Sequence, residues 1–169
     1  PELGLDVTTL PIEEVTEEDT LGQEYEEQDA GVEEVVCNGV MDPMLYEIFN
    51  TETHAHLADI REFLSQASAG DSMANESLAR ALHTLHGSAH MAEAEAIADL
   101  AGVLERWVKA LMGAGQPLAD EGCAVLTESV AIVDQMLSSL PNPISEPDRY
   151  AELMQHIDSL YKAVPAHSV

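Results

Sequence analysis

Residues 78–90 read Leu-Ala-Arg-Ala-Leu-His-Thr-Leu-His-Gly-Ser-Ala-His. Three or four residues separate the apolar positions of one face, Leu78, Leu82, Leu85 and Ala89, which is the spacing of a buried helical stripe. The histidines of this stretch recur at a similar spacing, and at about 100° per residue they fall roughly opposite that stripe. The stretch therefore predicts a helix that buries its leucines and turns its imidazoles outward.

A glycine lies beside the first of these histidines. Gly87 follows His83 by one turn, so the two residues share a face of the predicted helix. Glycine removes side-chain bulk next to the ring, and Ala79 and Ala94 lie near the same sector. We therefore expect Ala79, Gly87, His90 and Ala94 to form a low surface around His83 that a second protein can reach.

Helical spacing continues on both sides of this stretch. Predicted helices run over about 43–67, 74–91, 94–112, 117–140 and 147–164. No segment alternates with a period of two, so no sheet is expected. Each helix carries one apolar stripe, and such helices bury their stripes together as an all-α, antiparallel up-and-down four-helix bundle with an additional C-terminal helix.

Several polar residues and prolines predict where these helices begin. Asp42-Pro43 starts the first, because aspartate accepts from free amides and proline suits the first helical position. Residues 70–72 are expected to end that helix and cap the second. Pro117 is expected to begin the fourth helix, and Ser145 with Asp148 to form a partial capping box for the fifth.

The chain divides into segments of different composition. The residues before Met41 include no lysine or arginine, while acidic residues accumulate along them. This composition predicts an acidic, disordered linker over 1–40, followed by a helical domain over 41–165 and a short tail over 166–169. The chain begins without methionine or a signal segment, so we expect a piece of a longer protein.

The charge balance excludes two classes of partner. The net charge is -26, from 32 acidic and 6 basic residues. Such a surface repels nucleic-acid phosphates and anionic lipids, so neither nucleic acid nor a membrane is an expected partner. Cys37 and Cys123 form neither a CxxC pair nor a Cys/His metal spacing, which favours a metal-free protein in the reducing cytoplasm.

A carboxylate is available to orient His83. Glu105 adjoins the apolar stripe of the third predicted helix, close to its boundary with the second. A carboxylate bonded to one imidazole nitrogen holds the proton there and leaves the other nitrogen free to attack. His83 and Glu105 are therefore a predicted nucleophile and its orienting partner. The alternative for both residues is an exposed helical position with no chemical role.

The residues around His83 resemble the motif of histidine phosphotransfer (HPt) domains of the chemotaxis-kinase type. The matching positions are His83, Thr84, Leu85, Gly87, Ser88 and Ala89, then Ile97, Leu100, Ala101, Leu104 and Glu105. The similarity extends over about 41–111, with 41–49 similar to the family's first helix. It implies that His83 carries a phosphoryl group on its outer nitrogen while Glu105 hydrogen-bonds the inner one. His86, His90 and the acidic tail are similar to the multi-HPt hybrid kinases of the type IV pili chemosensory system.

Three positions depart from the family pattern. The family's lysine after Leu85 is His86, a loop glycine is Glu93, and a histidine common in chemotaxis kinases is Gly102. The lysine normally offers positive charge to the phosphoryl oxygens. His86 is accordingly expected to be the neighbour of the phosphoryl group, with that charge available only when the ring is protonated.

The resemblance implies a phosphocarrier without an active site of its own. Such a domain accepts a phosphoryl group from an ATP-binding kinase domain, in cis or in trans, and passes it to an aspartate of a response-regulator receiver domain. No cofactor is expected, because the partner domains would supply ATP and Mg²⁺. Two alternatives stay open, namely a degenerate HPt domain that only docks its partners and a helical metal-binding protein that uses His86 and His90.

Overall fold

The computed structural model describes residues 41–67, 72–140 and 146–165. It contains α1 (Pro43–Ala67), α2 (Glu76–Met91), α3 (Glu95–Ala114), α4 (Asp120–Ser139) and α5 (Pro147–Ala163). The described residues form no strand, apart from an isolated bridge between Met73 and Pro117. The prediction of an all-helical fold is confirmed for this part of the chain, whereas the predicted linker over 1–40 and the tail over 166–169 lie outside it.

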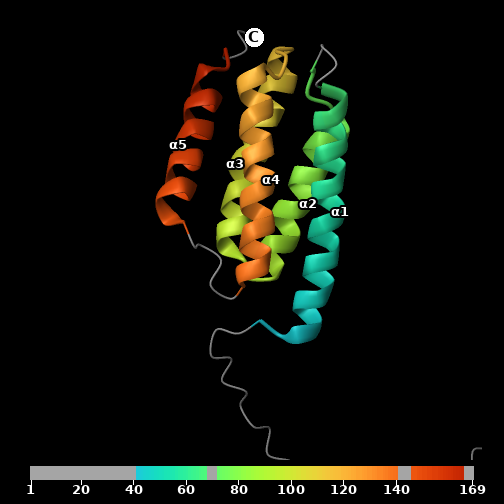
Figure 1. Ribbon diagram of the computed structural model, residues 1–169. Helices are drawn as coiled ribbons and strands as arrows, with labels where there is room; N and C mark the ends of the chain where they lie inside the picture. Colours follow the sequence, from blue (N-terminus) through green and yellow to red (C-terminus); the bar gives the residue numbers. More distant parts are fainter. Residues whose placement is uncertain (1–40, 68–71, 141–145, 166–169) are drawn as a thin grey trace, which may run out of the picture. The chain divides into compact units, whose positions relative to one another are not determined.

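The first four helices pack in a ring. α2 packs between α1 and α3, and α4 closes the ring by contacting both α3 and α1. Figure 1 shows that consecutive helices run in opposite directions. α5 contacts α3 and α4 but, among the described residues, not α2. The α2 side of the ring, which carries His83, is therefore not covered by the fifth helix.

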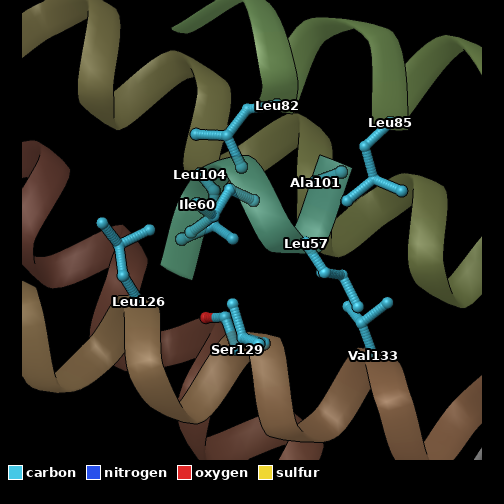
Figure 2. A pocket seen from close by; sticks show the side chains of 10 residues that line it. Leu57, Ile60, Leu82, Leu85, Ala101, Leu104, Leu126, Ser129 and Val133 are labelled. Carbon is cyan, nitrogen blue, oxygen red and sulfur yellow. The ribbon is translucent and has the colours of Figure 1, made fainter. Parts of the chain in front are cut away.

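The apolar stripes meet in one core. Leu78, Leu82, Leu85 and Ala89 are all at most 1% exposed, as their spacing predicts. Figure 2 shows part of this core, where side chains from the first four helices surround a small cavity. The only hydroxyl among the cavity's lining residues is that of Ser129, which donates to the carbonyl oxygen of Val125 at 2.7 Å. The cavity therefore offers an apolar surface and no site for a polar ligand.

The start of α1 is as predicted. The Oδ1 atom of Asp42 accepts from the backbone amides of Met44 and Leu45 at 2.9 and 3.1 Å. Those amides have no partner within the helix, so the side chain satisfies donors that the helix leaves free.

The predicted starts of α2 and α4 need correction. The cap of α2 is Asn75, whose Oδ1 atom accepts from the amide of Leu78 at 2.9 Å, whereas Ser72 donates to the carbonyl oxygen of Ala67. Pro117 does not begin α4, because the bridge to Met73 and a bond from the amide of Leu118 to Ser72 hold it in the preceding connection. α5 begins at Pro147, as predicted, and Glu146 before it makes no side-chain cap. Residues 70, 71 and 145, which are expected to take part in capping α2 and α5, lie outside the described residues.

The connection between α2 and α3 contains a strained residue. Glu93 has a φ of 57° and is the only non-glycine residue in the described segments with a positive φ. For an L-residue with a side chain, this conformation lowers the stability of the fold by about 1–2 kcal/mol, whereas glycine adopts it without that loss. The HPt motif that this sequence resembles has glycine at position 93. Glutamate at this position therefore lowers the stability of the connection.

We expect Glu93→Gly to be more stable to unfolding than Glu93→Ala by about 1 kcal/mol, because both changes remove the charge and only glycine relieves the strain. Urea denaturation of the two variants and the wild type measures this difference. Equal stability of the two variants would contradict the strained geometry.

Candidate functional site

The site is built across α2 and α3, with one carboxylate at its centre. The Nδ1 atom of His83 on α2 lies 2.8 Å from Oε1 of Glu105 on α3. The Nδ1 atom of His86, one turn further along α2, lies 3.2 Å from the second oxygen, Oε2. Lys109 on α3 donates to Oε1 from one turn beyond Glu105. The structure thus brings together the predicted pair His83 and Glu105, and adds two cationic or potentially cationic neighbours.

Glu105 is held as a carboxylate. Its side chain is only 9% exposed, and burial raises its pKa, but hydrogen bonds from Lys109, His83 and His86 lower the pKa by more. The net result is a pKa below the ordinary value of 4.5. Because the folded pKa is lowered, this group stabilises the fold above its unfolded pKa, and the contribution is lost as the pH falls through the folded pKa.

The ring of His83 is open to solvent while its inner nitrogen is held. Its side chain is 69% exposed. An ionised carboxylate can only accept, so Nδ1 of His83 carries the proton in the bond to Glu105. Nε2 of a ring protonated only at Nδ1 keeps its lone pair and is the nucleophilic atom.

The surface around His83 is partly as expected. Gly87 is exposed, and a Cβ atom there would meet no other atom within 4 Å. The packing of this chain therefore does not require glycine at that position. His90 is also exposed. Ala79 and Ala94 need correction, because they are 5% and 3% exposed and cannot form a contact surface themselves.

Both alanines belong to the hydrophobic core of the bundle. Ala79 lies on a helix that packs between α1 and α3. Ala94 is the N-cap of α3, and its amide donates to the carbonyl oxygen of Ala89 at 2.9 Å. The helical angle placed both residues near the histidine sector, but it could not show which neighbouring segment covers them.

His86 and His90 on α2 face different carboxylates. Nδ1 of His90 lies 3.7 Å from Oε1 of Glu95, whereas Nδ1 of His86 faces Glu105. Within the described segments, no group of three or more histidine, cysteine or acidic side chains is arranged to hold a metal ion. The Nδ1 atoms of the two rings that the metal-binding alternative would use thus face acidic side chains at different positions of α3.

The sequence that forms this site matches one known family. The sequence profile of the Hpt domain family matches residues 44–142, which is more than half of the 169-residue chain. The chain belongs to the Hpt domain family. No curated protein and no solved structure matches the chain significantly.

Membership of this family gives the general role of the chain. Hpt domains are the histidine phosphotransfer carriers of two-component signalling, and they interact with kinases and response regulators in a phosphorelay. The match covers α1 to α4 and ends before α5 begins. None of the described helices is both long and apolar enough to cross a bilayer.

The parts that Lys109 and Gly102 play in the Hpt site could hardly be predicted from the sequence. Lys109 follows Glu105 by four residues, a spacing that predicts an ion pair along a helix but not one directed at an oxygen shared with His83. Gly102 lies directly against the ring of His86: a Cβ atom there would be 3.3 Å from both Cε1 and Nε2 of that ring. That Gly102 leaves space for the ring of His86 is visible only in the packing of α2 on α3.

Proposed function

We propose that His83 accepts a phosphoryl group on Nε2 from a histidine kinase and passes it to the aspartate of a response-regulator receiver domain. The observation that carries this proposal is a single imidazole that is 69% exposed at one end and hydrogen-bonded at 2.8 Å to an almost buried carboxylate at the other. Exposure admits the donor, and the bond to Glu105 selects the nitrogen that attacks.

The chemistry needs no base to remove a proton. The Nε2 lone pair attacks phosphorus, a P–N bond forms, and the P–O bond of the donor breaks with its electron pair leaving on the donor oxygen. The ring, still protonated at Nδ1, becomes positively charged, and the Glu105 carboxylate stabilises that charge. In the onward transfer, a carboxylate oxygen of the receiver aspartate attacks phosphorus and a P–O bond forms. The P–N bond breaks, and its electron pair returns to Nε2.

The surface supports access by a protein-sized donor. Gly87 sits one turn from His83 on the same face, where a larger side chain would have free space within this chain. A glycine within a helix costs about 1 kcal/mol relative to alanine. Packing within this chain does not explain why a residue with this cost stands at position 87. We attribute it to the room that a partner domain needs beside His83.

The finer assignment follows the resemblance in sequence. We place this domain in a chemotaxis-type kinase, and in particular among the multi-HPt hybrid kinases of the type IV pili system, with a kinase domain supplying ATP and Mg²⁺ in cis or in trans. The competing candidate is a docking module, favoured by one observation: the lysine of the family motif is replaced by His86.

The test is phosphorylation followed by intact-mass measurement. We expect the chain to gain one acid-labile phosphate from acetyl phosphate or a phosphorylated histidine-kinase domain, and His83→Gln to gain none. The matched control is His156→Gln, which removes an imidazole bonded to Glu121 from α5, a helix that does not contact α2 in the described part of the chain, and should label like the wild type. If a known Hpt domain labels in parallel and this chain does not, the docking module replaces the carrier.

A further inference from the structure

The half-exposed ring of His86 lies with one side against α3. Its ring lies over Gly102 on α3, where a Cβ atom would come within 3.3 Å of Cε1 and Nε2 and 3.5 Å of Cδ2. Such distances are shorter than most contacts of a real Cβ atom, so a larger residue at 102 would have to push the ring aside. The absence of a side chain at Gly102 therefore makes room for His86.

This position directs one nitrogen of His86 at the carboxylate that holds His83. Nδ1 of His86 lies 3.2 Å from Oε2 of Glu105, and Nδ1 of His83 lies 2.8 Å from Oε1. Because an ionised carboxylate only accepts, both nitrogens donate. Each oxygen of Glu105 therefore has an imidazole of its own, and Lys109 adds a second donor to Oε1.

The second imidazole restricts the carboxylate. Rotation about the last side-chain bond of a glutamate has broad, shallow minima, so a carboxylate with a donor on one oxygen only is poorly fixed. Donors on both oxygens hold its plane, and that plane sets the direction in which Oε1 meets His83. The ring of His86 does not direct a free nitrogen toward the phosphoryl side, because Nδ1 is bonded and Nε2 lies over Gly102.

We infer that His86, seated on Gly102, is a positioning residue that fixes Glu105 and thereby the tautomer and orientation of His83. This assignment replaces the expected role of His86 as a direct neighbour of the phosphoryl group. It deepens the proposed function and rests on it, since His83 is the phosphoryl acceptor in both.

The experiment uses three single variants of the full chain and the double variant His86→Leu/Gly102→Val. His86→Leu removes the donor, and Gly102→Val displaces the ring while leaving the histidine in place. His86→Asn keeps an amide N–H near the position of Nδ1 but cannot become charged. For each variant, nitrogen NMR measures the fraction of His83 protonated at Nδ1, and acetyl phosphate labelling measures the rate of phosphorylation without any protein partner.

We expect His86→Leu and Gly102→Val each to slow labelling roughly tenfold, the low end for loss of a group that orients a reactive one. Both should also lower the fraction of His83 protonated at Nδ1. His86→Asn should stay within about twofold of the wild type, because the orienting hydrogen bond remains. The double variant should lose no more than either single variant, since both act through one contact.

Two results would overturn the inference. One is an unchanged His83 tautomer in both His86→Leu and Gly102→Val. The other is a His86→Asn variant that labels as slowly as His86→Leu, because the loss would then not come from the hydrogen bond to Glu105. The NMR measurement needs no phosphorylation, so it tests His86 even if the wild-type chain never labels and the proposed function fails. Should Gly102→Val unfold, the pair His86→Leu and His86→Asn decides the question alone.

Discussion

Glu105→Gln is expected to slow phosphorylation of His83 by roughly 10- to 100-fold, the range that applies when a carboxylate orienting a metal-bound imidazole is lost. The carboxylate accepts from His83 and Lys109 on one oxygen and from His86 on the other. A glutamine amide can accept only at its oxygen, and its N–H₂ group would oppose a second donor. The substitution also removes the negative charge that stabilises the ring once it carries a phosphoryl group.

The rate of labelling by acetyl phosphate, followed by intact-mass spectrometry, measures this effect without a partner protein. Glu128→Gln is a matched control, because it makes the same change on α4, where the carboxylate pairs with Arg149 and not with a histidine. We expect the control to label at the wild-type rate. Equal rates for Glu105→Gln and Glu128→Gln would show that Glu105 is only a structural partner of α2.

Leu126→Ala is expected to lower the free energy of unfolding by about 2–5 kcal/mol, as leucine truncations in closed cores do. Leu126 is fully buried on α4 and lines the small cavity of Figure 2 together with Leu82 and Leu104. Truncation would enlarge a space that the surrounding side chains already leave unfilled. The loss is large because the helices can relax only partly toward each other.

Urea denaturation measures this loss, and Leu45→Ala provides the matched control. Leu45 is 40% exposed at the start of α1, so its truncation should change stability by less than about 0.5 kcal/mol. At a temperature where Leu126→Ala remains folded, its His83 should still label, because α4 contributes no residue to the site. A loss for Leu126→Ala as small as that for Leu45→Ala would contradict the core described here.

The helices were predictable because each has to bury one stripe of side chains. The stripe of α2 at Leu78, Leu82 and Leu85 follows directly from the spacing of apolar residues, and so does the outward direction of His83. The start of α1 at Asp42 was equally predictable, because capping is a local interaction between residues two or three apart. The start of α4 was not, because Pro117 and Leu118 are held by the segment after α1, which is distant in sequence.

The sequence by itself determined the α-helices, their buried faces, the exposed His83 and Glu105 as its candidate partner, since these depend on the angle of each residue around its own helix axis. Only the tertiary structure decided that His86 and Lys109 share Glu105, that Gly102 makes room for the ring of His86, and that Ala79 and Ala94 are buried. It also placed Glu93 at a positive φ. The physical reason is that periodicity fixes a residue's direction on one helix, whereas the rotation and register of neighbouring helices decide what that residue meets.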